Sequence, residues 1–291
     1  MFTLIITSFN EVENTKKLIQ IVSKQLSKND QLILASPNME LKEFFENSRY
    51  TFKKLFIKDP HKGKPYALNL ALKKAEEKFI ICTDGDILLR DSSIKEILKP
   101  FSDKEVGLVS GRPISLDDKN SLLGFWSHFL THAAHVTRQK RENNNEFISA
   151  SGYLLAFRNF LIESIPSTTL VDDAWISHSI FRQGYKIAYA PLAKVEVYFP
   201  KNFSDWMKQK LRSVGGYNEK FIQESTSKMR SFKNESLLGV KLIFTYPQTL
   251  KQYFFTFLLV MARVYLWLLI TWKFKIKKSK VKWVRIESSK S

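Results

Sequence analysis

The sequence is poor in cysteine and in acidic residues, and both shortages limit what the protein can be. A single cysteine, Cys82, excludes an intramolecular disulfide and is typical of a protein in a reducing compartment. Because Cys82 lies inside an apolar run, we expect it to be a buried packing residue rather than a catalytic one. The 28 Asp and Glu are outnumbered by 46 Lys and Arg, which gives a formal net charge of +18. Such an excess favours anionic partners, namely nucleic acid, acidic lipid headgroups or phosphorylated substrates.

The N-terminus lacks the features of a secretory signal. No basic stretch precedes the short apolar run at residues 1–6, and the polar residues 8–11 interrupt that run at once. We therefore expect the catalytic part of the chain to lie on the cytoplasmic side of the cell membrane.

A long apolar run does occur near the C-terminus, at residues 253–272, and it is long enough to cross a bilayer core of about 30 Å. Arg263 interrupts it, and both flanks are basic: residues 201–251 hold ten Lys and Arg against four acids, and residues 273–285 hold seven Lys and Arg. A single span cannot put both flanks in the cytoplasm, as the positive-inside rule requires. Three arrangements stay open: a span with a translocated basic tail, an interfacial or re-entrant segment with Arg263 reaching outward, and a buried core helix.

Strand-like and helix-like segments alternate through the first half of the chain, which is typical of an α/β fold with a parallel sheet. We expect strands at residues 2–7, 31–35, 54–57, 79–83 and 106–110, and helices at 12–26, 41–48, 65–77 and 92–98. The character of the sequence changes after residue 117. From there we expect an amphipathic helix at 121–137, a strand at 148–157, a helix at 173–182, a strand at 186–190 and a basic, partly helical stretch at 203–228.

An acidic turn follows the apolar segment 79–83, where Asp84 and Asp86 flank Gly85. In open α/β sheets, ligands bind at the carboxyl ends of the strands. Two carboxylates at such a place suit a hard cation such as Mg²⁺ or Mn²⁺ that bridges to phosphate oxygens. Asp-Gly-Asp also occurs as an ordinary solvated turn, so the tripeptide alone does not decide the function.

Six segments in this order resemble the family 2 glycosyltransferases, the large inverting group that contains chitin, cellulose and hyaluronan synthases and many lipid-linked-sugar transferases. They are residues 3–11 (TLIITSFNE), 61–69 (HKGKPYALN), 83–86 (TDGD), 151–158 (SGYLLAFR), 171–175 (VDDAW) and 209–213 (QKLRS). The last three resemble the family's glycine-containing strand, its Asp-Asp motif and its Gln-x-x-Arg-Trp motif. Each segment is weak to moderate evidence alone, but together they span roughly residues 2–220.

The resemblance implies a GT-A type fold, in which helices flank a Rossmann-like, mostly parallel sheet, with amphipathic or hydrophobic helices at the C-terminus. We expect a catalytic domain at residues 1–230 and a membrane-associated segment at residues 231–291. That segment contains the apolar run 253–272 and the basic tail 273–291.

For the donor side, the resemblance implies a nucleotide-sugar site, UDP- or GDP-linked, with Mg²⁺ or Mn²⁺ as cofactor. The residues that would bind the donor are Ser8, Asn10, Glu11, Lys64, Asp84, Gly152 and Arg212. Asp86 would ligate the metal, Lys64 would offer a positive charge to phosphate, and Asp84 would contact the nucleoside or Lys64. Two ordinary interpretations stay open: Glu11 as a first-turn acid favoured by the helix dipole, and Lys64 as the basic start of a helix.

For the acceptor side, the resemblance makes Asp173 the general base, which takes the proton of an acceptor hydroxyl as that oxygen attacks the anomeric carbon. Asp172 and Gln209 would lie near the acceptor, and Arg212 would close over the diphosphate. Asp172 could instead be a helix N-cap, and Arg212 part of a basic surface. Ser213 stands where the family motif has tryptophan, which favours a single addition over the synthesis of a long polymer.

Three histidines, His128, His132 and His135, share one face of the helix expected at 121–137. No acid or cysteine completes a metal site with them, so we expect this helix to lie at the membrane interface or at the mouth of the acceptor site.

The sequence therefore predicts an inverting glycosyltransferase that acts on a membrane-proximal acceptor, either lipid-linked or saccharide, without a nucleic-acid partner. Two alternatives compete with this prediction. A nucleotidyl transferase would have a Gly-rich phosphate loop after its first strand, and residues 8–11 do not form one. A basic membrane- or nucleic-acid-binding protein with a catalytically inactive transferase fold would show salt-sensitive binding to DNA or lipid without turnover.

Overall fold

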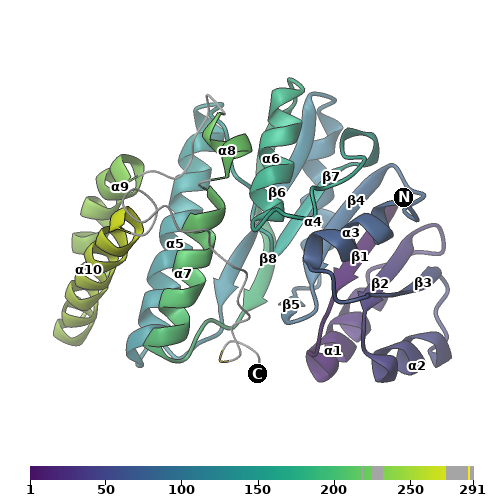
Figure 1. Ribbon diagram of the computed structural model, residues 1–291, viewed down its shortest axis with the longest axis horizontal. Coiled ribbons are helices and arrows are strands. Elements are labelled where there is room, and N and C mark those ends of the chain that lie inside the picture. Colours follow the sequence, from purple (N-terminus) through teal and green to yellow (C-terminus); the bar gives the residue numbers. More distant parts are fainter. Residues whose placement is uncertain (218, 225–231, 273–287, 289–291) are drawn as a thin grey trace. The chain divides into compact units, whose positions relative to one another are not determined.

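The computed structural model of the protein describes residues 1–217, 219–224, 232–272 and 288 (Figure 1). The chain divides into two compact units, residues 1–113 with 146–197, and residues 114–145 with 198–291. The expected domain boundary at residue 230 and nearly all of the basic tail lie outside the described residues. The assignment of a catalytic domain to residues 1–230 therefore stays a prediction.

In the described part of the chain, eight strands form one sheet in the order β3-β2-β1-β4-β7-β6-β8-β5. The strands are β1 Phe2–Thr7, β2 Gln31–Ser36, β3 Lys53–Lys58, β4 Phe79–Asp84, β5 Ile87–Leu89, β6 Val106–Ser115, β7 Leu154–Arg158 and β8 Lys186–Val197. Strands β3, β2, β1 and β4 are parallel, whereas β7 is antiparallel to β4 and β6, and β5 is antiparallel to β8. The predicted α/β class is confirmed, with its parallel pairings in the first half of the chain.

The central strands are apolar along their whole length because both faces of this part of the sheet are covered. Ile5, Ile33 and Ile81, on three neighbouring strands, have no exposed surface. The edge strand β3 differs, since it is partly exposed and has lysines at both ends. Lysine at an edge discourages pairing with another chain.

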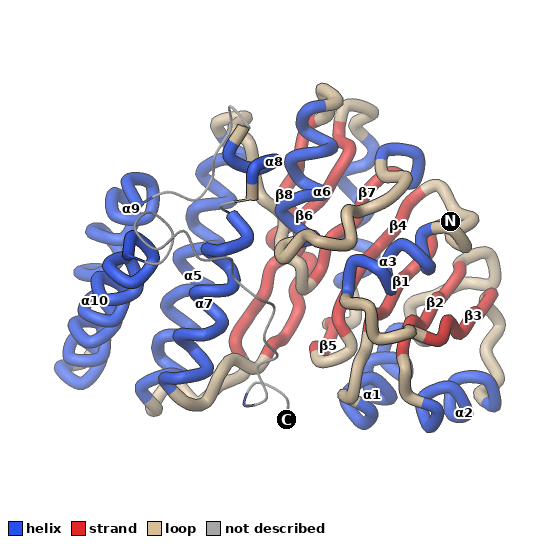
Figure 2. Tube along the Cα trace, viewed as in Figure 1, coloured by secondary structure: helices blue, strands red, loops and turns tan. Residues whose placement is uncertain are grey.

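Helices pack on the sheet of the first unit (Figure 2). They are α1 Val12–Ser23, α2 Met39–Asn47, α3 Lys64–Leu72, α4 Ser93–Leu98 and α6 Asp172–Arg182, with short 3-10 turns at Lys99–Ser102 and Asn159–Leu161. Helix α3 packs on β1 and β2, and α4 and α6 pack on β8. Gly63 begins α3 with φ +100°, a backbone conformation that favours glycine, and Pro65 occupies the first turn.

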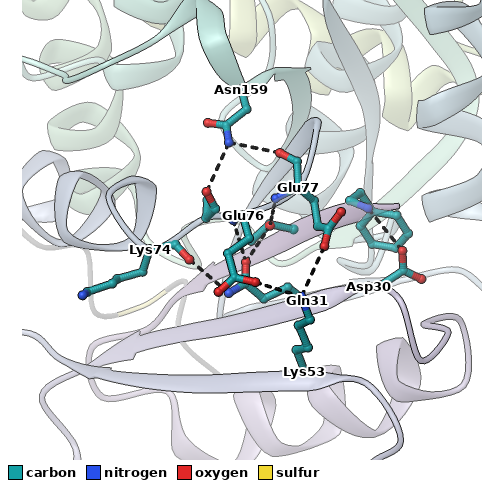
Figure 3. A network of polar contacts seen from close by, with 10 residues as sticks. Asp30, Gln31, Lys53, Lys74, Glu76, Glu77 and Asn159 are labelled. Carbon is teal, nitrogen blue, oxygen red and sulfur yellow. Dashed lines mark hydrogen bonds and ion pairs between the residues drawn. The ribbon is translucent and has the colours of Figure 1, made fainter.

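Helix α3 is shorter than predicted, because side chains from elsewhere bond to polar backbone groups of residues 74–77 (Figure 3). The Gln31 side chain donates to the carbonyl of Lys74 at 3.0 Å and accepts from the amide of Glu76 at 3.1 Å. The Asn159 amide donates to two further carbonyls of this loop, at 3.2 and 3.0 Å. The backbone is therefore satisfied without a helix, and it turns directly into β4.

The strand predicted at 148–157 is also shorter, since β7 begins only at Leu154. Before it, the amide of Ala150 donates to Ser177 Oγ at 2.9 Å and the amide of Ser151 donates to Ser110 Oγ at 3.0 Å. These hydroxyl groups replace the strand neighbours that a longer β7 would need. By contrast, β6 and β8 are longer than predicted, and the short strand β5 was not predicted at all.

The second unit contains the helices α5 Leu122–Asn143, α7 Phe203–Tyr217, α8 Lys220–Gln223, α9 Phe232–Thr245 and α10 Leu250–Ile270. Its apolar cluster is formed by Phe125, Trp126, Phe129, Trp206, Met207, Leu242, Leu259, Ala262, Leu266 and Ile270. The predicted amphipathic helix at 121–137 is confirmed as α5, which Ser121 caps by accepting from the amide of Gly124. The apolar run predicted at 253–272 is α10, and within the described residues it alone is long and apolar enough to cross a membrane.

Candidate active site

The acidic turn lies where β1 and β4 end side by side. Thr7 and Asp84 are partners in the parallel ladder, and the amide of Gly85 donates to the carbonyl of Thr7 at 2.8 Å. The Thr7 hydroxyl donates to Asp84 Oδ1 at 3.3 Å. The turn 84–86 and the loop after β1 therefore meet at the carboxyl ends of two adjacent parallel strands, the place where ligands bind in this class of sheet.

The buried hydroxyl groups of Ser8 and Thr15 pack against this turn. Thr15 of α1 donates to the carbonyl of Gly85 at 3.1 Å, and its Oγ1 lies 2.7 Å from Ser8 Oγ. Because the carbonyl can only accept, Ser8 is the donor to Thr15. A Cβ added at Gly85 would lie 2.5 Å from Thr15 Oγ1 and 2.6 Å from Ser8 Cβ, so only glycine fits here.

Sequence reasoning missed Thr15, although a signal was present. Thr15 precedes Leu18, Ile19 and Val22 at helical spacing, and it shares their buried face with no exposed surface. Ser8, which was expected to contact the nucleoside, is 6% exposed and uses its hydroxyl beneath the turn. A contact between Ser8 and the nucleoside stays a prediction.

The loop between β1 and α1 is held in shape by Glu11. Its Oε2 accepts from the amides of Phe9 at 2.9 Å and Asn10 at 3.0 Å, and the residue is 9% exposed. The ring of Phe9 packs edge-on against the ring of His61, with ring centres 5.0 Å apart. His61 belongs to the loop before α3, so this aromatic pair links two of the motifs that the resemblance rests on. Neither ring was among the expected site residues.

Lys64 joins two acidic residues that lie far apart in the sequence. Its Nζ is 2.7 Å from Asp84 Oδ1 and 3.3 Å from Asp172 Oδ2. The three side chains come from α3, β4 and α6, and 28%, 27% and 16% of their surfaces stay exposed. The structure therefore confirms that Lys64 and Asp84 contact one another, and it adds Asp172 to them. A partly exposed lysine between two carboxylates offers a positive charge that an anionic ligand can reach.

The charges of this cluster shift the pKa values of its members. Burial opposes the charged form of Lys64, but the carboxylates of Asp172 and Asp84 outweigh it, so the pKa of Lys64 is raised. Burial raises the pKa of Asp172, and the charge of Lys64 offsets this only in part. Burial also raises the pKa of the Cys82 thiol to about 12, in agreement with its expected role as a packing residue.

Asp173, the expected general base, is held at the start of α6 by backbone groups. Its Oδ2 accepts from the amide of Gly152 at 3.0 Å and its Oδ1 from the amide of Ala174 at 2.9 Å. Each carboxylate oxygen has two lone pairs, so both retain capacity for a further hydrogen bond. The alternative interpretation of Asp172 as the helix N-cap is wrong, because Val171 occupies that position.

The donor set at the turn fits a divalent cation that shares its coordination with a ligand. Asp84 Oδ1 is engaged by Lys64 and Thr7. Asp86 as the metal ligand stays a prediction. Over the described ranges, no group of three or more His, Cys, Asp or Glu side chains is placed to hold a metal ion. Mg²⁺ and related hard cations are commonly bound by one or two carboxylates together with phosphates of the substrate, and the residues present match that pattern.

The histidines of α5 contact other groups of the second unit. His128 Nε2 contacts the carbonyl of Asp117 at 2.8 Å, and the ring of His132 packs against Tyr246 with ring centres 5.0 Å apart. His132 and His135 are neighbours on the helix, with ring centres 6.3 Å apart.

Gln209 and Arg212 lie on α7, in the second unit. Gln209 Oε1 is buried, and it has no hydrogen-bond partner within the described part of the chain. The predicted contacts of Gln209 with the acceptor and of Arg212 with the diphosphate stay predictions.

The chain is similar in sequence to curated synthases of two staphylococci. The chain is 22% identical to the poly-beta-1,6-N-acetyl-D-glucosamine synthase of Staphylococcus aureus over 241 residues, which cover 79% of this chain and 57% of that protein. The synthase of Staphylococcus epidermidis is 21% identical over 243 residues, which cover 79% of this chain and 58% of that protein. The chain thus spans less than two thirds of the length of these relatives.

Solved structures share the fold. The mannosyltransferase PcManGT from Pyrobaculum calidifontis, in complex with GDP-Man and Mn²⁺, matches with a TM-score of 0.64 at 18% identity, over 96% of this chain and 81% of that one. S. aureus TarS 1-349, in complex with UDP-GlcNAc, matches with a TM-score of 0.50 at 12% identity, over 88% and 79% of the two chains. These likenesses confirm the predicted GT-A type fold.

The family model described as "Glycosyltransferase like family 2" matches residues 1–216, which is well over half of the chain and includes every segment on which the resemblance rests. The chain therefore belongs to the family 2 glycosyltransferases.

Proposed function

We propose that this glycosyltransferase moves a sugar from a UDP- or GDP-linked donor to a membrane-proximal acceptor, either a saccharide or a lipid-linked molecule, with inversion and with Mg²⁺ or Mn²⁺. The observation that carries the proposal is the cluster of Lys64, Asp84 and Asp172 next to Asp173. The positive charge of Lys64 suits the diphosphate of the donor. The separate carboxylate of Asp173, which backbone amides hold in place, suits the hydroxyl of the acceptor. The ligands named for the structural relatives, GDP-Man with Mn²⁺ and UDP-GlcNAc, support this class of donor.

On the donor side, the chain supplies charge and shape. Lys64 is protonated at neutral pH because its pKa is raised, and it faces the leaving diphosphate. Asp86 would hold a divalent cation, which would further neutralise the charge of that group. Ser8, Asn10 and Glu11 belong to the loop that borders the nucleoside, and the two amides bonded to Glu11 fix the conformation of this loop. Gly152 borders the donor from the side of β7 and lets the chain pass close to Asp173.

On the acceptor side, Asp173 accepts the proton of the attacking hydroxyl as the new bond to the anomeric carbon forms and the bond from that carbon to the diphosphate breaks. The amides of Gly152 and Ala174 orient its carboxylate before the acceptor arrives. Base and leaving group lie on opposite faces of the sugar, so the configuration inverts. The resemblance to the Gln-x-x-Arg-Trp motif assigns Gln209 to the acceptor and Arg212 to the diphosphate.

Ser213 favours the transfer of one sugar, whereas the curated relatives are named as synthases of a polymer. The two outcomes differ in the length of the product. Mass spectrometry of the products made with excess donor distinguishes them: one added sugar supports single transfer, and a ladder of additions shows polymerisation.

A thermal-shift panel tests the donor proposal. Purified protein is melted with UDP-, GDP- and CMP-sugars, each with and without Mn²⁺, and a donor that binds the folded state raises the melting temperature by mass action. We expect one UDP- or GDP-sugar to give a shift that needs Mn²⁺ and to be hydrolysed or transferred. Asp86→Ala should abolish both effects, whereas Asp91→Ala, which removes an exposed carboxylate after β5, should keep them. Wild-type turnover by Asp86→Ala would rule out the metal role, and the absence of any shift or turnover would favour an inactive fold.

A further inference from the structure

Helix α10 has two faces of different kinds. The buried positions Thr256, Leu259, Ala262, Leu266 and Ile270 recur at three- and four-residue intervals and form one face. The opposite face is apolar but exposed, and it includes Tyr253, Phe254, Phe257, Met261, Val264 and Leu268. Each of these side chains leaves between 45% and 65% of its surface uncovered. Only 28% of the most apolar window of the helix is buried, so α10 is not an ordinary core helix.

Arg263 lies on the side of α10 that faces the protein. It follows Leu259 by four residues and precedes Leu266 by three, so all three share a face of the helix. The charge that interrupts the apolar run is therefore absent from the exposed face, which stays apolar over a helix about 31 Å long. Of the three arrangements that the sequence leaves open, the interfacial one therefore does not need Arg263 to reach outward.

The inner face of α10 is fixed to other helices of the second unit (Figure 1). Trp126 Nε1 of α5 donates to the carbonyl of Phe255 at 2.8 Å, and Leu259 and Leu266 belong to the same apolar cluster as Trp206 of α7. If α10 crossed the membrane, it would either lose these contacts or take α5 and α7 into the bilayer with it. Both helices hold several Lys and Arg, whose insertion into hydrocarbon is strongly unfavourable.

We propose that α10 lies in the plane of the cytoplasmic membrane surface, with its exposed apolar face sunk into an anionic lipid leaflet, and does not cross the bilayer. In this arrangement the basic residues on both sides of the helix stay with the lipid headgroups, so the positive-inside rule holds for both flanks. The exposed residues Val240 and Phe244 extend the apolar surface at the end of α9, where Tyr253 Oη donates to the carbonyl of Phe244.

A second copy of the chain is the competing occupant of this face. The net charge of +18 opposes the meeting of two copies and favours acidic lipid, because like charges repel and anionic headgroups attract basic flanks. Charge complementarity therefore selects the lipid surface.

Vesicle sedimentation of the full chain tests the proposal with matched variants. Phe257→Asp on α10 is compared with Phe160→Asp in the first unit, since these phenylalanines are 59% and 69% exposed. Leu268→Asp is compared with Leu192→Asp, at 65% and 59% exposed. Within each pair, the two substitutions change the charge and the exposed apolar area by similar amounts. Because the positions are exposed, we expect both variants to stay folded, and the melting temperature checks this.

We expect the wild type to bind phosphatidylcholine vesicles that contain phosphatidylglycerol more tightly than pure phosphatidylcholine vesicles. The α10 variants should bind at least about tenfold more weakly, because binding scales with buried apolar area, and the controls should bind like the wild type. Equal binding by α10 variants and controls would overturn the proposal. So would gel filtration in which Phe257→Asp turns a dimer into a monomer while vesicle binding is unchanged, since a second copy would then cover the face.

Maleimide labelling separates a helix in the membrane plane from a spanning one. Gln248→Cys and Ser288→Cys place thiols on the two sides of α10, and the buried Cys82 serves as background. In sealed membrane vesicles from a bacterial host that expresses the full chain, an impermeant maleimide should label both positions in inside-out vesicles and neither in right-side-out ones. Labelling of one position in each kind of vesicle would show a span and refute the proposal.

This inference rests on the membrane-proximal acceptor of the proposed function and on none of its chemistry. The nucleotide-sugar shift with Mn²⁺ is therefore measured on the same α10 variants. Retained donor binding without any vesicle binding by the wild type would refute only the membrane arrangement, whereas vesicle binding without any donor binding would refute only the proposed function.

Discussion

Replacing Gly85 by alanine adds one methyl group at the most crowded point of the candidate site. The new Cβ would lie 2.5 Å from Thr15 Oγ1, 2.6 Å from Ser8 Cβ and 2.8 Å from Ser8 Oγ. Ordinary contacts of a Cβ begin at 3.4 Å, so the turn would have to move by roughly an ångström to relieve the overlap. Thr15 and Ser8 cannot yield easily, because they are 0% and 6% exposed and are hydrogen-bonded to each other.

The expected cost follows from this geometry. Overpacking by one methyl group in a closed site costs about 1–3 kcal/mol, and for a domain of this size each kcal/mol lowers the melting temperature by about 2–4 °C. The melting temperature of Gly85→Ala should therefore fall by roughly 2–12 °C. The shift also moves Asp84 and Asp86, and a misplacement of about an ångström can reduce turnover about hundredfold.

The assay combines thermal melting with donor turnover at saturating Mn²⁺. Gly239→Ala is the control, because a Cβ at Gly239 meets nothing within 4 Å and alanine favours the helical conformation of α9. It should melt at or slightly above the wild-type temperature and keep full turnover. If Gly85→Ala melts and turns over like the wild type, the packing of this turn on Thr15 and Ser8 does not govern the site.

Four further changes probe the surroundings of the turn. Thr15→Val removes a hydroxyl but keeps the shape, so it should cost about 1–3 kcal/mol in urea unfolding and weaken donor binding, whereas Thr15→Ser should largely restore both. Lys64→Met leaves Asp172 without its cation and raises the pKa of that carboxyl further. The unfolding free energy of this variant should therefore fall most, relative to the wild type, near neutral pH. The difference should shrink as the pH drops toward about 4, because the carboxyl is then protonated. Asp173→Asn should lower transfer at least about hundredfold in a product assay while the Mn²⁺-dependent thermal shift persists. Cys82 should resist a thiol reagent in native protein at mildly alkaline pH, because burial shields the thiol and raises its pKa, and it should react quickly in denaturant.

Much of the fold could be predicted from the sequence because its signals are local. The strands β1, β2 and β4 are short apolar runs in which nearly every residue is buried, and such runs need no knowledge of distant neighbours. The acidic turn was identified for the same reason, since Gly85 follows directly on a buried strand.

The errors arise where distant residues decide local structure. Helix α3 ends at Leu72 because Gln31 and Asn159, far away in the sequence, satisfy the backbone of the next residues. The short strand β5 exists because β8 lies beside it, and three residues carry too little pattern to show this.

The candidate site follows the same division. Lys64, Asp84 and Asp172 were named from motifs, but only the fold shows that one lysine serves both acids. Thr15 was missed because a threonine on a buried helix face indicates a hydroxyl that needs a partner but not which partner, and only the fold places that hydroxyl under Gly85.

On the proposed function, the shared lysine makes donor binding at this site an exchange of ion pairs rather than the addition of one. Lys64 already neutralises Asp84 and Asp172, so a diphosphate that approaches Lys64 competes with two carboxylates for one positive charge. A nucleotide without a metal ion would take Lys64 away from Asp84 and Asp172. Two partly buried carboxylates would then lack a counter-ion, which is energetically unfavourable. A nucleotide that arrives with its own divalent cation brings the charge that the cluster would otherwise lose. On the proposed function, the resting ion pairs therefore act as a filter that rejects uncomplexed nucleotides before any chemistry begins.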